Sequence, residues 1–265
     1  MTQRHSNRLL AFYTFCICCF APAAVLVILI ESITAANYVS FPPVGFSLRW
    51  YAEIANRPEF IDSLMVSLTV ALFSAILSSL IGALASLALV RYRFAGRNLL
   101  QLLFLAPLSV PAIVLGIALL QFFAAYNVPR NMGTLILAHA LITMPYTIRL
   151  ISVSLATFDR NLELAARNLG AGPIRTFWRI TMPLIRPGML AGCIFAFIVS
   201  FDEISVTIFL SGATSMTLPV RIYNYIDQSY DPFVTAVSSI LILIVVVLAI
   251  AIERTVGIGK LFGVR

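Results

Sequence analysis

The sequence predicts an all-α integral membrane protein with six transmembrane helices and one cytoplasmic loop that contains helices of its own. Of its 265 residues, 60% are hydrophobic and 11% are charged, whereas about a quarter of a soluble domain is charged. About 20 apolar residues span a bilayer as a helix, and six stretches qualify: roughly 9–31, 62–90, 99–125, 133–155, 188–211 and 232–252. The basic residues lie between these stretches, which indicates membrane topology rather than nucleic-acid binding. We therefore expect residues 1–265 to form a single transmembrane domain.

The basic residues also predict the orientation in the membrane. With the N-terminus inside, only Arg49, Arg57, Arg130 and Arg221 of the 18 Lys and Arg residues lie outside, which leaves the other 14 on the cytoplasmic side. Because basic residues favour that side, both termini are expected in the cytoplasm. The first apolar run is too long for the core of a signal peptide, which predicts an uncleaved anchor.

The segment 34–61 lies outside in this topology. Its Pro- and Gly-containing stretch 42–45 predicts irregular backbone, and Phe46–Ala55 can form a short helix at the membrane interface. Trp50 and Tyr51 are typical of the lipid headgroup region, and contact with an external partner is the alternative.

One of the expected spans carries a signal for close helix packing, and another carries a signal for a bend. In 62–90, four small residues recur every fourth position and form one ridge that lets another helix approach closely: Ser74, Ser78, Gly82 and Ser86. In 99–125, Pro107 and Pro111 each remove a backbone hydrogen bond, so this helix is expected to bend or break. The bend is either purely structural or lines a substrate pathway.

The longest cytoplasmic loop, about 156–187, is patterned as two short helices. Asp159 is a candidate N-cap for the first, and Gly170 a candidate C′ residue after its end. Pro173 suits the first turn of the second helix, which Pro183 and Pro187 are expected to end. The apolar residues of the loop fall on helical faces: Leu162, Ala165, Ala166 and Leu169 in the first, and Ile174, Phe177 and Trp178 in the second.

The strings AARNLGA and FWRITMP in this loop resemble the coupling loop of ABC importer permeases. The family pattern is Glu-Ala-Ala, three residues, Gly, nine residues and Ile-x-Leu-Pro. It is matched by Ala165, Ala166, Gly170, Ile180 and Pro183, with Met182 in place of leucine. The resemblance implies the ABC importer permease fold and a loop that docks into a cleft of an ATP-binding subunit. The docking candidates are Leu162, Glu163, Leu164, Ala165, Ala166, Gly170, Ala171, Phe177, Ile180 and Pro183.

One position departs from the pattern. Leu164 occupies the place of the family's glutamate, and Glu163 lies one residue earlier. A shift of one residue turns a helical side chain by about 100°, so Glu163 is not expected to replace it. Leu164 points away from the apolar face and is expected to be buried only by a partner.

Further strings resemble the second permease of spermidine/putrescine-type importers: FSLRWY, RYRFAG, HALITMPY, SFDE and TLPVRIY. The resemblance implies a bacterial inner-membrane complex with a second permease as heterodimer partner, two ATP-binding subunits and an extracytoplasmic solute-binding protein. It also implies transport of a small polar solute such as a polyamine. The polar segment 211–232, with Asp227 and Asp231, is then a solvated loop or a contact for the binding protein.

Two intramembrane carboxylates are candidates for the substrate pathway, together with Pro107 and Pro111. Asp202 and Glu203 lie within the expected span 188–211, where charge is costly and usually faces a cavity or partner. They suit a cation, but a structural or gating role remains open, and as neighbours at most one points into a pathway. His139, alone in its span, is expected to hydrogen-bond a neighbouring helix.

Three functions compete on the sequence. The first is a permease subunit of an ATP-driven importer, and the second a stand-alone transporter or channel with Asp202 and Glu203 as a proton or cation site. The third, a membrane enzyme, is disfavoured because the sequence has no HExxH, Walker A or Ser-x-x-Lys motif, and GIGK at 257–260 lacks the spacing of a phosphate loop. No cofactor or metal is expected, and ATP would be bound by partner subunits.

Overall fold

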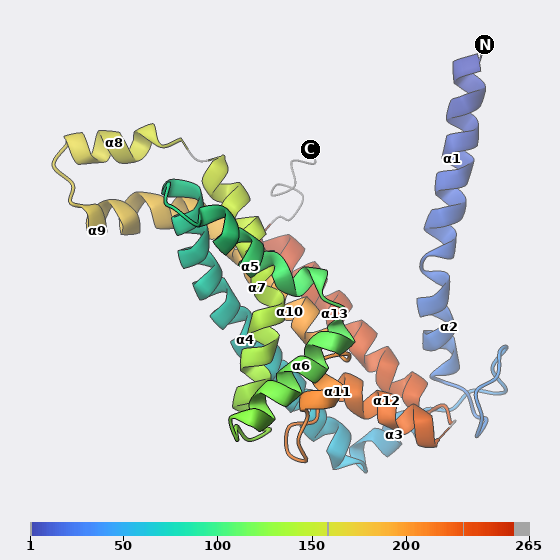
Figure 1. The fold of residues 1–265 in the computed structure, drawn as a ribbon. Coiled ribbons are helices and arrows are strands. Elements are labelled where there is room, and N and C mark those ends of the chain that lie inside the picture. The colour runs from blue at the N-terminus through green and yellow to red at the C-terminus, as the bar shows by residue number, and fades with distance from the viewer. Residues whose placement is uncertain (1, 158, 230, 257–265) are drawn as a thin grey trace. The chain divides into compact units, whose positions relative to one another are not determined.

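The computed structural model describes residues 2–157, 159–229 and 231–256 (Figure 1). The segment 257–260, Lys260 and Arg265, which entered the sequence predictions, lie outside the described residues. The chain forms two compact units, one made of Met1–Ile61 and Ile222–Thr255 and the other of Asp62–Arg221 and Val256–Arg265.

The regular secondary structure of the described residues is helical, as predicted, and these residues also form one isolated β-bridge between Thr34 and Phe46. The helices are α1 Thr2–Phe20, α2 Ala23–Glu31, α3 Arg49–Ala55, α4 Pro58–Arg91, α5 Arg97–Ser109, α6 Ala112–Ala125, α7 Met132–Ala156, α8 Asn161–Asn168, α9 Pro173–Thr176, the π-helix η1 Phe177–Thr181, α10 Met182–Asp202, α11 Thr207–Leu210, α12 Leu218–Gln228 and α13 Phe233–Val256.

Four or five candidate spans appear among the described residues, where the sequence predicts six. Four helical segments are long and apolar enough, namely Leu10–Glu31, α4, α7 and Pro173–Asp202, and the bent pair α5 and α6 makes a fifth if it is one span. The sixth predicted stretch, 232–252, falls on α13, whose apolar part over the described residues, Phe233–Val247, is shorter than a full span. The first span is interrupted between α1 and α2, where Pro22 lies at the N-cap of α2.

The predicted outer segment is more buried than the sequence indicates. Its helix α3 begins at Arg49, three residues later than expected, and Trp50 is only 6% exposed. The hydroxyl of Tyr51 is 2.6 Å from Ser32 Oγ and 2.7 Å from Ser239 Oγ. The burial of Trp50 contradicts the expectation that its side chain faces lipid headgroups. Tyr51 is half-buried and finds polar partners within this unit.

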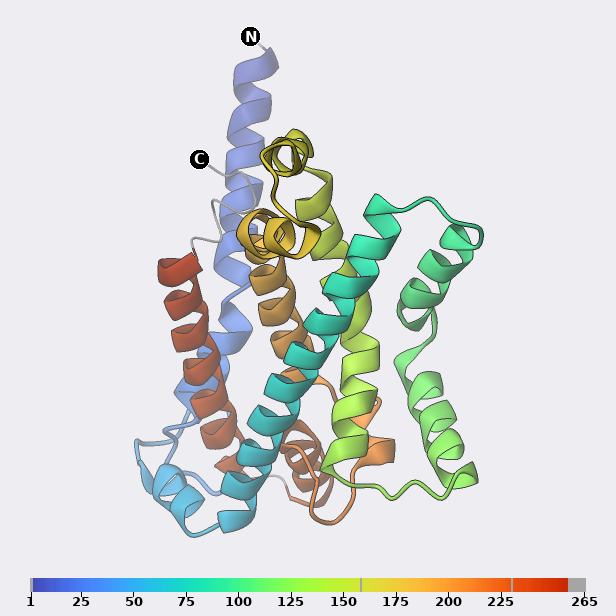
Figure 2. The same ribbon diagram turned by 90° about the vertical axis from the view of Figure 1, so that its left-hand side faces the viewer.

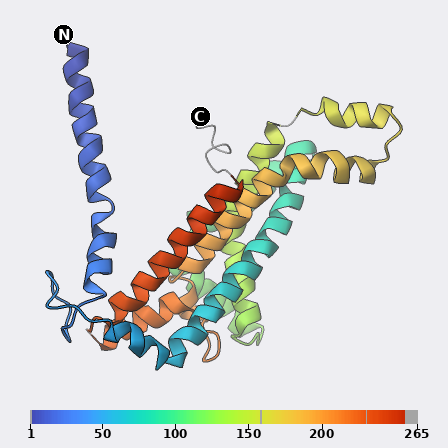
Figure 3. The same cartoon turned by 180° about the vertical axis from the view of Figure 1, so that it is seen from behind.

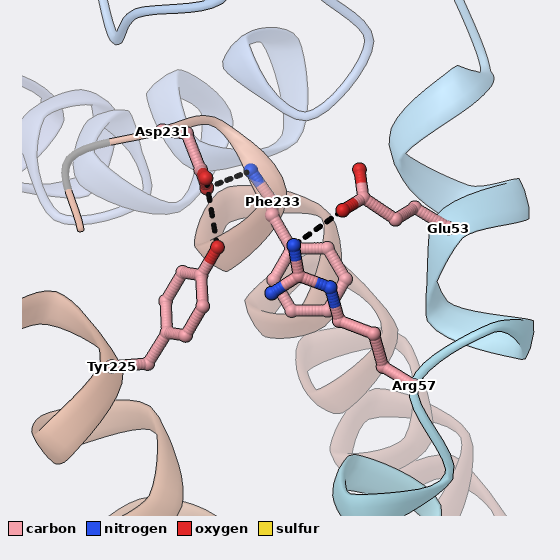
Figure 4. Close-up of polar contacts among 5 residues, drawn as sticks. All are labelled: Glu53, Arg57, Tyr225, Asp231 and Phe233. Carbon is pink, nitrogen blue, oxygen red and sulfur yellow. Dashed lines mark hydrogen bonds and ion pairs between the residues drawn. The ribbon is translucent and has the colours of Figure 1, made fainter. Parts of the chain in front are cut away.

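A cluster of aromatic and charged side chains joins distant segments of this unit (Figure 4). The guanidinium of Arg57 lies 4.3 Å from the ring centre of Phe233 and 5.2 Å from that of Tyr225, and it binds the carboxylate of Glu53. The Tyr225 hydroxyl donates to Asp231 at 2.7 Å, and Asp231 also accepts the backbone N–H of Phe233 at 3.1 Å. The segment 211–232 is thus not a solvated loop: it contains α12, whose first residues are buried, and Asp231 is bound within the chain, whereas Asp227 is exposed.

Burial and the hydrogen bond to Asp231 raise the pKa of Tyr225, and they outweigh the opposing effect of Arg57. Because the folded protein holds this proton more tightly, the stabilisation is fully present below a pH of about 10 and is lost as the pH rises through the raised pKa. The measurement is the tyrosinate absorbance of wild type minus that of Tyr225→Phe, and we expect this difference to appear only above that pH. In Asp231→Asn this signal should move to lower pH. If the tyrosinate absorbance of Tyr225 develops below a pH of about 10, the assigned burial is contradicted.

The ridge of small residues on α4 packs against α7, which confirms the packing prediction. Ser74 Oγ donates to the carbonyl of Ile136 at 3.0 Å, and Ser86 Oγ donates to that of Ile148 at 2.9 Å. Between these contacts, the Thr147 hydroxyl donates to the Ser78 carbonyl at 2.9 Å, and a Cβ on Gly82 would lie 2.4 Å from Thr147 Oγ1. Helix α7 also packs against α10, again at glycines, Gly188 and Gly192.

The proline-containing span is broken, as predicted. The axes of α5 and α6 differ by 108°, and Figure 2 shows the two helices as a bent pair. Val110 between them is extended, with ψ 130°, and Pro111 is the N-cap of α6. This follows from the proline ring, which disfavours helical backbone in the residue before it. Pro107 remains inside α5.

Candidate functional site: the α8–α9 hairpin and the break after α10

A hairpin of α8 and α9 occupies the predicted loop and projects from the ends of α7 and α10 (Figure 1). Asp159 accepts the N–H of Asn161 at 3.0 Å, although the N-cap position itself is taken by Arg160. Gly170 ends the helix with a φ of 85°, as predicted, since this left-handed conformation suits glycine. The N–H groups of Gly170 and Ala171 bond the carbonyls of Arg167 and Ala166 at 2.9 and 3.0 Å, the pattern of a Schellman C-cap.

The second helix of the hairpin does not end at the prolines. Pro173 is at its first turn, as predicted, but the helix continues through η1 into α10 (Figure 3). The prediction that Pro183 and Pro187 end it is therefore wrong. The reason is the π-turn, in which the N–H of Met182 bonds the carbonyl of Phe177 five residues back. Pro183 then falls in the first turn of α10, where its missing N–H leaves no helical hydrogen bond unmade.

The hairpin exposes large apolar side chains. Leu169 is 89% exposed, Ile174 75% and Trp178 60%, and the indole of Trp178 meets the ring of Phe177 edge-on. Leu164 is 53% exposed, so it points outward as predicted. The other docking candidates are spread over both sides: Leu162, Ala165, Gly170 and Pro183 are exposed, and Ala166, Ala171, Phe177 and Ile180 are half-buried.

Glu163 is the buried residue of α8. Its Oε1 lies 2.5 Å from a guanidinium nitrogen of Arg91 at the end of α4, and it also accepts the hydroxyl of Thr181 in η1. The π-turn places Thr181 at this carboxylate, so one buried charge ties α4, α8 and η1 together. Local patterns in the sequence do not indicate Arg91 as the partner of Glu163, because 72 residues separate the two.

The two intramembrane carboxylates lie at a helix end rather than within a span to residue 211. Helix α10 stops at Asp202, Glu203 is extended with ψ 119°, and the chain resumes as α11. The Glu203 carboxylate accepts the N–H of Val206 at 2.9 Å, while Asp202 is exposed. The predicted continuous helix fails here because Glu203 bonds this backbone itself, in competition with the helical ladder.

His139 holds the two sides of this break together. Its Nδ1 is 2.8 Å from Ser200 Oγ in α10, and its Nε2 is 2.9 Å from Thr207 Oγ1 in α11. All three residues are buried, and the prediction that His139 hydrogen-bonds a neighbouring helix is confirmed. Gly116 of α6 meets the backbone of Ser205 and Val206 in the break, so the bent span packs on the broken one. Of the proline candidates, Pro111 is exposed and Pro107 half-buried.

A family model described as the inner membrane component of binding-protein-dependent transport systems matches residues 78–256, more than half of the chain. The chain belongs to this family. It is therefore an ABC transporter permease, a multi-pass inner-membrane protein that is not itself catalytic. A binding-protein-dependent system implies in general an ATPase, a partner permease and a binding protein. Membership in the family favours a permease subunit over the stand-alone transporter.

Known relatives and structures agree with this membership. The permease is 32% identical to a putrescine transport system permease of Escherichia coli K12 over 84% of this chain and 82% of the relative. It is 33% identical to a spermidine/putrescine transport system permease of Haemophilus influenzae, covering 78% and 80%. The fold is similar to a chain in the crystal structure of a bacterial ABC transporter that imports the polysaccharide alginate, with a TM-score of 0.75, 16% identity and coverage of 96% and 98%.

Proposed function

We propose that this permease subunit receives the motion of an ATP-binding subunit through the α8–α9 hairpin. The observation that supports it is the projecting, ordered hairpin whose outermost side chains, Leu169, Ile174 and Trp178, are large, apolar and exposed. Exposed apolar patches of this kind mark interaction sites. The C-cap at Gly170 and the Glu163–Arg91 pair give the hairpin a fixed shape, and a fixed shape is suited to transmitting displacement.

The proposed topology has six spans with both termini in the cytoplasm. It counts α5 and α6 as one broken span and α13 as the sixth. The orientation rests on the excess of basic residues on one side. This excess supports a cytoplasmic hairpin, which an ATP-binding subunit could reach.

In the proposed assembly this chain pairs with a second, homologous permease as a heterodimer. Two ATP-binding subunits dock on the cytoplasmic side, and a solute-binding protein docks on the outer side. The relatives named for putrescine and spermidine/putrescine transport support a polyamine or related amine as the solute.

The proposed substrate pathway passes the break after α10. The exposed carboxylate of Asp202 at the end of a membrane span would attract a cationic amine. Glu203, whose carboxylate binds the backbone of the break, is assigned a structural or gating role. Pro107 and Pro111 shape the bent span that packs on this break. The continuous helix from Pro173 to Asp202 connects the hairpin to the break, so it would transmit a movement of the hairpin to the pathway.

The test is the binding of the detergent-purified permease to its cognate ATPase, compared between wild type and Leu169→Asp/Ile174→Asp. Both side chains are exposed, so these substitutions leave the hairpin folded, and we expect at least a tenfold loss of affinity (about 1.4 kcal/mol). The control is Tyr92→Asp, which changes another large exposed side chain, outside the hairpin and directly after α4. An equal effect of both variants, or none, would overturn the docking assignment.

A further inference from the structure

The α8–α9 hairpin presents almost no negative charge, although it contains two carboxylates. Glu163 is 5% exposed and paired with Arg91 and Thr181 inside the unit. Asp159 lies at the base of the hairpin, where its carboxylate binds the N–H of Asn161. No other Asp or Glu occurs between residues 159 and 187, all of which the structure describes.

Positive charge surrounds the exposed apolar residues of the hairpin. Its arginines before α10 are exposed, and none forms an ion pair with a carboxylate among the described residues: Arg160, Arg167, Arg175 and Arg179. Arg160 precedes Leu164 by four residues, and Arg167 follows it by three. Both arginines therefore lie on the same helical face as Leu164. Leu164 thus lies between two arginine positions on this face, at the place where the family pattern has a glutamate.

This arrangement restricts the chemistry of a partner. A cleft with a cation opposite position 164 would meet a leucine and two arginines, and like charges brought together at an interface cost several kcal/mol. A cleft with an apolar floor would bury Leu164, and carboxylates at its rim would face the arginines. Charge complementarity of this kind raises the rate of association and selects the partner.

We propose that the ATPase cleft that receives this hairpin is apolar at its centre and acidic at its rim, with an uncharged surface opposite Leu164. The inference rests on the proposed docking function and names the partner's chemistry. A consequence is selectivity: ATPases whose cleft carries a cation for the family's glutamate would bind this permease poorly.

The test compares Leu164→Glu with Leu164→Gln, which is similar in shape but uncharged, by measuring affinity and association rate for the cognate ATPase. Leu164 is exposed, and a glutamate there can pair with Arg160 or Arg167, so both variants keep the hairpin intact; equal thermal unfolding midpoints check this. We expect Leu164→Glu to lose at least about tenfold more affinity than Leu164→Gln, and wild-type association to slow as salt is raised. Arg167→Gln/Arg175→Gln should slow it at low salt.

Tighter binding by Leu164→Glu than by Leu164→Gln would overturn the proposal and indicate that the cleft has a cation opposite position 164. Equal binding would also overturn it, because a negative charge at this position would then meet neither an apolar nor an acidic surface. Failure of wild type to bind the ATPase would instead overturn the docking function itself. The two failures are therefore distinct, since only the first occurs in a permease that binds.

Discussion

Gly188→Val is expected to prevent stable packing of α10 on α7 and to lower the yield of folded permease. A Cβ at Gly188 would lie 2.2 Å from Ser154 Oγ, 2.7 Å from Ser154 Cβ and 3.0 Å from the carbonyl oxygen of Leu150. The last contact is with backbone of α7, which cannot rotate away, so the helices must separate. Overpacking of this kind costs about 1–3 kcal/mol or more, and valine adds two further methyl groups.

The measurement is the thermal unfolding midpoint and the monodisperse fraction of the detergent-purified protein. Gly172→Val is the matched control, because a Cβ at Gly172 meets nothing within 4 Å. Gly188→Ala is expected to be milder and to be rescued in part by Ser154→Gly, which removes the two closest atoms. If Gly188→Val unfolds at the same temperature as Gly172→Val, the close contact between α7 and α10 is not present in the protein.

Glu163→Ala is expected to release the hairpin from α4 and to uncouple it from the rest of its unit. Removal of one partner from a buried ion pair costs about 3–5 kcal/mol, and the lower end applies because the side chain of Arg91 remains 17% exposed. The loss also removes the acceptor of the Thr181 hydroxyl. Trypsin should then cleave faster at the arginines of the hairpin, and the assembled transporter should hydrolyse ATP without importing solute.

The control is Asp159→Asn, which alters an exposed carboxylate of the same hairpin and should have a small effect. A double-mutant cycle with Arg91→Met isolates the energy of the pair from the other contacts of each residue. An interaction energy near zero, with unchanged trypsin cleavage, would show that Glu163 does not anchor the hairpin.

Much of the fold follows from local patterns in the sequence. The apolar runs determine the helical class. The chemistry of proline explains the break at Val110–Pro111, and Gly170 ends α8 because only glycine readily adopts a positive φ. The ridge from Ser74 to Ser86 indicates close approach of another helix, and the hairpin motif with family resemblance points to the docking surface. Each of these features depends on residues that are close in the chain, so it can be predicted from periodicity and spacing.

Other features were decided only by the tertiary structure. The role of Glu163 depends on Arg91, which is brought to it by the packing of α4, and the choice of α7 as the partner of the ridge depends on Thr147. The burial of Trp50 and the hydrogen bond between Tyr51 and Ser239 likewise depend on the tertiary structure of their unit. The helix continues past Pro183, and stops at Asp202, because the π-turn and the Glu203 carboxylate rearrange backbone hydrogen bonds. Residue type and spacing do not encode which distant groups meet, since many packings satisfy the same hydrophobic pattern and specific contacts select among them.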